Sequence, residues 1–189
     1  SNVSFGGWAS GVAFVIVAEN SGLATISGQI FVAGSTSPDS TLIDGVVLKG
    51  HETLYYTPSV SHTLTVKNCV LDATGLTGAF DEVVRTKPTG GTLTMVFENI
   101  AAYGFPAATN RSGRLEFTSP ATLDITFKGY TQRGGALKLY SGGPVSMSGS
   151  ILKLDGALDA DTNTAWAMVE TITNQASPGW STETGCTFG

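Results

Sequence analysis

The sequence predicts an all-β fold made of many short strands, and three features of its composition point to it. Charged residues are only 13% of the 189 residues, whereas long surface helices usually need more Glu, Lys and Arg. Gly is abundant, at 24 residues, which favours tight turns between strands. Hydrophobic residues make up 41%, enough for a sizeable core in one domain or one elongated module.

The charge balance argues against a nucleic-acid partner, and the apolar runs are too short to span a membrane. The net charge is -5, and the 10 Lys and Arg residues form no cluster that could contact a phosphate backbone. The longest apolar run, VAFVIVA at 12–18, is far below the roughly 18 residues that a bilayer requires. We interpret it as a buried strand.

Six segments share a pattern of alternating apolar residues that ends at Gly or Asn. They are ATISG at 24–28, VVLKG at 46–50, LTVKN at 64–68, LTMVFEN at 93–99, LDITFKG at 123–129 and VSMSG at 145–149. Gly and Asn are the residues that most readily adopt a left-handed backbone. We therefore interpret the last residue of each segment as a bend between two strands, with Asn68 equivalent to Gly28, Gly50 and Gly149.

The spacing of the segments predicts a solenoid. Their first residues, 24, 46, 64, 93, 123 and 145, are separated by 22, 18, 29, 30 and 22 residues, within the range of stacked repeats. Over 24–156 the pattern resembles the right-handed parallel β-helix of pectate-lyase-like proteins and phage tailspikes. The clustered acidic and basic residues of the lyases are not found at matching positions, so the resemblance transfers no catalytic residue.

An antiparallel β-sandwich or barrel of the viral structural type is the alternative fold. In that fold Gly and Asn would mark hairpin turns or bulges. The clean alternation of residues 123–128 suits a strand with one face exposed in either architecture.

The repeats define one β domain over 1–173, followed by an irregular C-terminal arm over 174–189. We expect the arm to dock on another surface through Trp180 and Phe188, because aromatic residues are enriched at interfaces. Alternatively, both side chains cap the open end of the core.

Two segments interrupt the repeats. The sequence predicts one or two helical turns at 79–86, with Asp81, Glu82 and Arg85 facing water. It predicts a loop within 104–122, followed by a short strand at 115–117.

The two cysteines do not form a disulfide framework. Cys69 lies in a strand-like segment and is expected to be buried; a bridge to Cys186 is left open.

The motif DADTNTAWAMVE at 159–170 places oxygen-bearing side chains at the spacing of a calcium-binding loop. The candidate ligands are Asp159, Asp161, Asn163 and Glu170. Thr164 occupies the position where such a loop needs Gly, so a turn closed by its own side chains is the competing interpretation. The sequence predicts no cofactor other than this Ca²⁺.

Catalytic signatures are absent from the sequence, which favours a non-enzymatic protein. The two histidines, His51 and His62, lie in no recognised motif, and a lone His on a strand is usually at the surface or half-buried. Glycan hydrolysis needs two placed carboxylates. Stacking could bring Glu98 near Asp124, but surface exposure explains both more simply.

Scattered aromatic residues could form a platform for sugars, although core or interface positions are more usual. The residues are Tyr55, Tyr56, Tyr103, Phe105, Tyr130 and Trp166. We expect Tyr103, Phe105 and Tyr130 to act at an interface.

These features favour a self-assembling structural protein on the exterior of a virion, such as a bacteriophage tail, fibre, spike or capsid-decorating component. Its partners would be further copies of the chain, as a trimer or larger assembly, and other virion proteins. A glycan-binding or glycan-degrading β-helix that meets polysaccharide is one alternative. An extracellular filament or adhesin subunit is the second.

Overall fold

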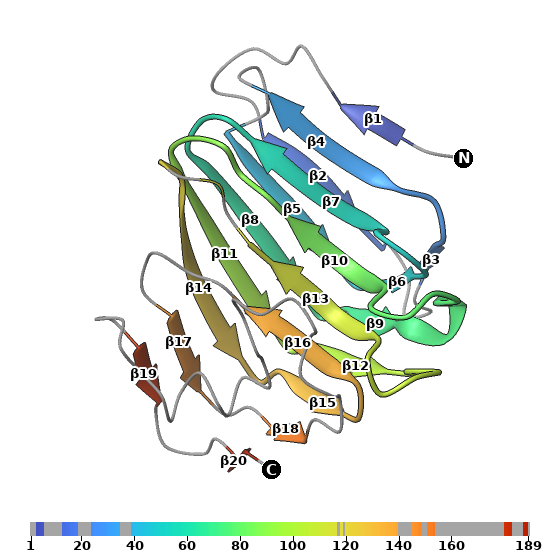
Figure 1. The fold of residues 1–189 in the computed structure, drawn as a ribbon. Coiled ribbons are helices and arrows are strands. Elements are labelled where there is room, and N and C mark those ends of the chain that lie inside the picture. Colours follow the sequence, from blue (N-terminus) through green and yellow to red (C-terminus); the bar gives the residue numbers. More distant parts are fainter. Residues whose placement is uncertain are drawn as a thin grey trace.

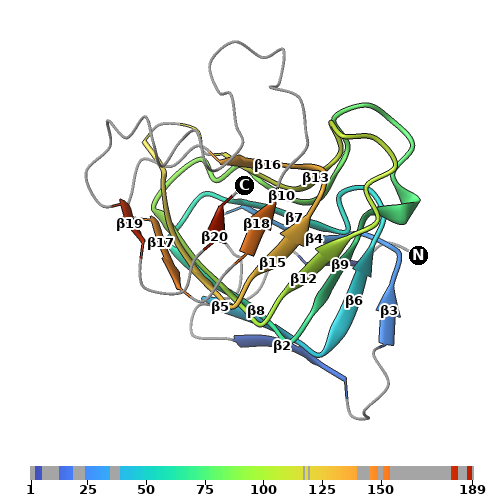
Figure 2. The ribbon, with the colours of Figure 1, turned by 90° about the horizontal axis from the view of Figure 1, so that it is seen from below.

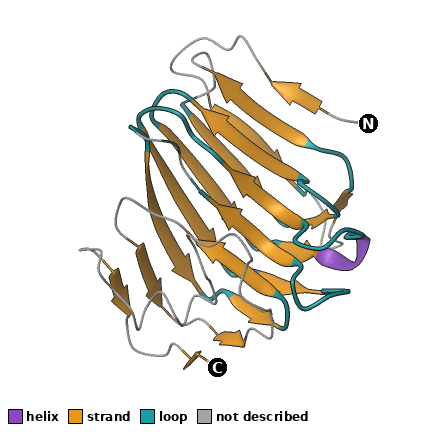
Figure 3. Ribbon diagram, viewed as in Figure 1, coloured by secondary structure: helices purple, strands orange, loops and turns teal. Residues whose placement is uncertain are grey.

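The computed structural model shows an all-β chain whose strands wind into a stack of coils (Figure 1). The structure describes residues 3–5, 13–18, 24–34, 39–116, 118, 120–139, 145–148, 151–153, 180–182 and 187–188. A single short helix, η1 (Ala73–Gly75), lies among the strands and loops of this part of the chain (Figure 3).

The strands form three sheets, and successive strands along the chain enter the sheets in rotation. Sheet A contains β1 (Val3–Phe5), β4 (Ile30–Gly34), β7 (Leu54–Pro58), β10 (Glu82–Thr86), β13 (Arg111–Leu115) and β16 (Ala136–Leu139). Sheet B contains β2 (Ala13–Val17), β5 (Ser40–Asp44), β8 (His62–Lys67), β11 (Thr92–Glu98), β14 (Thr122–Lys128), β17 (Val145–Ser148) and β19 (Trp180–Thr182). Sheet C contains β3 (Ala24–Ile26), β6 (Val46–Lys49), β9 (Val70–Asp72), β12 (Ala101–Tyr103), β15 (Thr131–Arg133), β18 (Ile151–Lys153) and β20 (Thr187–Phe188).

Each coil takes one strand from each sheet, and neighbouring coils pair in parallel. We number the coils so that coil 1 is β1–β3, coil 2 is β4–β6, and so on to coil 6, which is β16–β18. Residues one coil apart lie side by side, as Leu93 does with Leu123. Figure 2 looks along the stack and shows the sheets as its sides. The chain is therefore all-β with three parallel sheets, which is the arrangement of a parallel β-solenoid.

The core fills the space between the sheets, because alternate residues of each strand point inward. On β8 the buried side chains are His62, Leu64 and Val66. Phe97 and Phe127 stack in neighbouring coils with their ring centroids 5.4 Å apart. Such stacking explains why a unit of some 30 residues, too small to fold alone, is stable in an array.

Several polar side chains lie in the interior, and His62 and Cys69 have polar contacts there. His62 is buried, whereas a surface or half-buried position was expected for it. It pairs with the buried Leu93 of the next coil, so its side chain points into the core. Its Nε2 lies 3.2 Å from the hydroxyl oxygen of Thr41. Cys69 is a free, buried thiol that donates to the carbonyl of Lys67 over 3.0 Å, and burial raises its pKa. Cys186 lies outside the described residues.

The bend at Asn68 is a corner between sheets B and C, but its equivalents differ from those expected. The residues at this corner in coils 2 to 5 are Gly45, Asn68, Asn99 and Gly129, with φ of 72°, 52°, 53° and 63°. Register pairs Thr41 with Leu64 and Val46 with Ala24, so ATISG and VVLKG belong to sheet C and not beside LTVKN. Gly50 marks a different corner, and Gly149 lies outside the described residues.

The strands of both non-repeating segments differ from those that the sequence predicted. Residues 82–86 form β10 instead of helical turns, because they pair with β7 on one side and β13 on the other. The next strand of sheet A is 111–115, ahead of the predicted 115–117. In the predicted arm, the described residues form β19, which pairs with β17, and β20, which pairs with β18.

Candidate functional site

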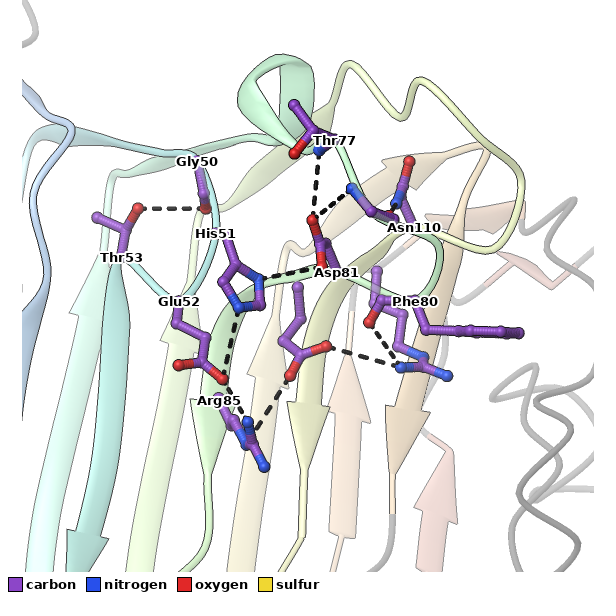
Figure 4. Close-up of polar contacts among 12 residues, drawn as sticks. Gly50, His51, Glu52, Thr53, Thr77, Phe80, Asp81, Arg85 and Asn110 are labelled. Carbon is purple, nitrogen blue, oxygen red and sulfur yellow. Dashed lines mark hydrogen bonds and ion pairs between the residues drawn. The ribbon is translucent and has the colours of Figure 1, made fainter.

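Charged side chains gather where the chain passes from sheet C to sheet A in three consecutive coils (Figure 4). A polar pair precedes or begins the sheet-A strand each time: His51-Glu52 before β7, Asp81-Glu82 at β10 and Asn110-Arg111 at β13. Parallel stacking places these turns above one another. We call the group of His51, Glu52, Asp81, Glu82, Arg85 and Arg111 the corner cluster.

Asp81 organises the turn that carries it. Its Oδ2 accepts hydrogen bonds from the backbone N–H of Gly78 at 2.7 Å and of Thr77 at 3.3 Å. A Cβ on Gly78 would lie 2.9 Å from the Asp81 carboxylate, so a larger residue there would push the carboxylate away from the turn. Asn110 of the next coil donates from Nδ2 to the Gly78 carbonyl over 2.7 Å and so holds the turn to its neighbour.

Two arginines flank the buried carboxylate of Glu82. A guanidinium nitrogen of Arg111 lies 3.6 Å from one carboxylate oxygen, and Nε of Arg85 lies 3.8 Å from the other. Arg111 also donates to the Phe80 carbonyl over 2.9 Å and covers the Phe80 ring at 4.9 Å. Arg85 bonds to Glu52 of the preceding turn. Glu82 therefore links its own coil to the next one.

Burial is the main influence on the Glu82 pKa. It disfavours the charged carboxylate and raises the pKa above its usual value, although Arg111 and Arg85 act in the opposite direction. Only 2% of Glu82 is exposed, which separates the carboxyl group from any molecule in the solvent. A raised pKa can mark a catalytic acid, but here it accompanies a structural ion-pair network.

His51 is the exposed member of the corner cluster. Its Nδ1 lies 3.5 Å from the Asp81 carboxylate, and its Nε2 lies 3.7 Å from the Glu52 carboxylate, as Figure 4 shows. Each carboxylate of the cluster thus faces a guanidinium or an imidazole. The chemistry that this arrangement supports is charge neutralisation between coils.

A second group of charges continues along the outside of sheet A. Glu116 lies 2.7 Å from Lys138 and 2.9 Å from Arg114. Burial alone would raise the Glu116 pKa, but the two cations offset it, and the pKa is lowered. Asp72 behaves similarly: Lys49, at 2.8 Å, and Thr74 outweigh burial and lower its pKa.

The structure separates the carboxylates that stacking could have brought together. Glu98 lies beside Lys128, whereas Asp124 lies beside Thr94, further back on the strand. The pairing of Glu98 with Asp124 that stacking could have produced does not form, because the two residues occupy different positions in two strands of equal length.

The predicted interface aromatics lie in different surroundings. Tyr103 is exposed, Phe105 packs partly buried against the core, and Tyr130 is fully enclosed in the interior. Tyr56 is also buried, and Tyr55 is half-buried on the outer side of sheet A. Trp180 lies on β19 and Phe188 on β20, whereas Trp166 lies outside the described residues.

The predicted calcium ligands cannot be placed. Asp159, Asp161, Asn163 and Glu170 all lie outside the described residues. In the described ranges no group of three or more His, Cys, Asp or Glu side chains is arranged to hold a metal ion. The same ranges contain no helix with the length and apolarity needed to cross a membrane.

Sequence reasoning overlooked Glu52, Glu82 and Arg111 as members of a site. One signal could have revealed them: polar pairs recur at 51–52, 81–82 and 110–111, with the spacing of about one coil. The first two pairs follow turns that contain Gly50 and Gly78, so the spacing of the pairs could have placed them side by side.

The fold and the corner cluster together define the class of this protein: a parallel β-solenoid whose coils are held by side-chain ion pairs. Comparisons of the chain with protein-family models, with curated proteins and with solved structures found no match.

Proposed function

We propose that this protein is a non-enzymatic structural component of a virion exterior, and that it assembles with further copies of itself. A bacteriophage tail, fibre, spike or capsid-decorating protein is the specific form of the proposal. It includes a right-handed winding of the coils, which is the hand of almost all parallel crossover connections.

The observation that carries the proposal is that the polar side chains of the described region tie coil to coil. Glu52–Arg85 and Glu82–Arg111 link coils 3, 4 and 5 at the corner cluster, and Lys138–Glu116 links coils 5 and 6. Lys67–Asp44 and Lys49–Asp72 link coils 2 and 3. Charges that neutralise one another in this way stiffen a rod, which suits a building block.

Light scattering after size-exclusion chromatography, together with electron microscopy, tests the proposal. We expect a homo-oligomer, a trimer or larger, that leaves a panel of polysaccharides intact. Gold-labelled antibody against the chain should decorate the outside of purified particles. A chain that stays monomeric at all concentrations and shortens a polysaccharide would overturn the proposal.

Glycan binding is a second candidate, favoured by one observation on the outer side of sheet A. Phe31 and Tyr55 pair with their ring centroids 5.2 Å apart, and the Arg85 guanidinium lies 5.3 Å from the Tyr55 ring. Aromatic surface bordered by hydrogen-bonding groups is typical of ligand sites. A glycan array separates this function from the first: specific binding that Tyr55→Ala abolishes would support it.

A further inference from the structure

The outer side of sheet B presents side chains in three columns that run along the stack from β2 to β14. Its flanking column is small and mostly polar, its central column is uncharged, and its third column, next to the corner with sheet C, carries alternating charges. In coil order the columns are Ala13, Ser40, Thr63, Thr94 and Asp124; Val15, Leu42, Thr65, Val96 and Thr126; and Val17, Asp44, Lys67, Glu98 and Lys128. We call this surface the sheet-B face.

The sheet-B face is accessible to solvent. Val15 and Val17 are 53% and 51% exposed, which is unusual for large apolar side chains on a sheet. Thr63 and Lys128 are also exposed, and the other central residues of the face are partly exposed. An accessible face with an uncharged centre and charges along one side has the anatomy of a protein interface.

The third column reads negative, positive, negative, positive from Asp44 to Lys128. A column of this kind is self-complementary when a second copy is turned by a two-fold axis that lies in the interface along the strand direction. The axis reverses the order of coils in the second copy and keeps each column opposite itself. Asp44 then faces the second copy's Lys128, and Lys67 faces its Glu98, so all four charges meet opposite charges.

We propose that the sheet-B face is a two-fold interface between copies of this chain, with their solenoid axes antiparallel. This inference rests on the proposed self-assembly and names the surface that mediates it. The same axis sets Thr65 against Val96 and Leu42 against Thr126, and no charge enters these central contacts. An isologous contact of this kind needs only one surface, as two-fold symmetry requires.

The size of the face sets the expected strength of the contact. Five strands about 4.8 Å apart, with about five residues each at about 3.3 Å, give roughly 400 Å² per copy. Specific interfaces commonly bury about 800 Å² per partner. We therefore expect association that depends on concentration and adds to other contacts in a larger assembly.

Charge reversal at the centre of the column tests the interface. Lys67→Glu would bring two carboxylates together at both symmetry-related contacts between positions 67 and 98, and Glu98→Lys would bring two ammonium groups together there. Each variant should therefore bind itself at least about tenfold more weakly than wild type. A mixture of the two variants pairs unlike charges at both contacts between positions 67 and 98. It should associate more tightly than either variant alone, measured by biolayer interferometry with one copy immobilised.

The double variant Lys67→Glu/Glu98→Lys restores opposite charges at both contacts and should self-associate as wild type does. Lys87→Glu, an exposed position outside this face, makes the same change in net charge as Lys67→Glu and should also bind as wild type does. Circular dichroism and the melting temperature show whether each variant is folded. If one single variant does not fold, the self-affinities of the other single variant and of the double variant still test the interface.

Equal self-affinity of Lys67→Glu and wild type, or a double variant that binds itself no more tightly than the single variants, overturns the interface. Light scattering on wild type separates this inference from the proposed function. If the chain assembles and these substitutions do not weaken the assembly, the sheet-B interface is wrong but the proposed self-assembly is not.

Discussion

At the scale of single residues, Glu82 shows how the stack accommodates a charge in its interior. The side chain begins β10 and is nearly inaccessible, yet its carboxylate has Arg111 and Arg85 within 3.8 Å. Burial still dominates, so the pKa is raised. A buried ion pair contributes little net stability, but removing one partner leaves the other charge uncompensated.

The raised pKa of Glu82 predicts a pH dependence of stability that Glu82→Gln removes. Because the folded-state pKa lies above the unfolded value of about 4.5, the stabilising contribution of protonated Glu82 is present below that pH. It is lost as the pH rises through the folded pKa. The free energy of unfolding of wild type relative to Glu82→Gln should therefore fall as the pH rises from about 4 to about 8.

Urea denaturation of both proteins over this range measures the difference. Taking the difference cancels the opposite, low-pH contributions of Asp72 and Glu116, whose pKa values are lowered. A difference that grows with pH would mean that the two arginines outweigh burial, and would refute the prediction.

At the scale of elements, the corner between sheets B and C is held by a short ladder of side chains. Asn68 donates from Nδ2 to Asp44 over 2.8 Å, and Asn99 donates from Nδ2 to Asn68 over 3.1 Å. Both asparagines have a left-handed backbone, which their short polar side chains tolerate. The corner thus combines a local backbone requirement with contacts between coils 2, 3 and 4.

Glycine usually destabilises a strand more than alanine does, and at position 68 this order of stability should be reversed. Ala and Gly both lose the side-chain hydrogen bonds, but Ala alone adds the left-handed strain of about 1–2 kcal/mol. We expect Asn68→Ala to be less stable than Asn68→Gly by about 1 kcal/mol, measured by chemical denaturation. At Thr65, inside β8, we expect the usual order: Thr65→Gly should be less stable than Thr65→Ala by about 0.5–1 kcal/mol. The same order at both positions would show that the corner imposes no strain.

At the scale of the whole molecule, the stack was predicted from the sequence, whereas the site was not. Alternating apolar residues and recurrent Gly or Asn are local features, so they indicated strands, corners and parallel coils. Register depends on contacts between distant residues. It was assigned wrongly for VVLKG, because TLIDG at 41–45 is the true neighbour of LTVKN. The corner cluster arises from register: its residues lie about one coil apart, in turns and at the starts of strands where the apolar pattern of the six segments does not recur.

The one-dimensional stack also predicts how stability is distributed along the chain. Coils contact only their neighbours, so a strand paired on both sides should open less often than one paired on one side. β8 lies between β5 and β11, whereas β2 pairs with β5 alone among the described strands. We expect amide hydrogen exchange at 62–67 and 92–98 to be at least about tenfold slower than at 13–17, as followed by mass spectrometry.

Two substitutions sharpen this expectation, because both shorten an inward-facing apolar side chain. Met95→Ala in β11 removes a fully buried group. It should accelerate exchange in β8 and β14 together, since both strands pair with β11. Ile16→Ala in β2 shortens a side chain that is only partly buried and should accelerate exchange in coil 1 while leaving β11 unchanged. If either substitution accelerated exchange uniformly along the chain, the molecule would unfold as one cooperative unit and the description as a stack of separable coils would fail.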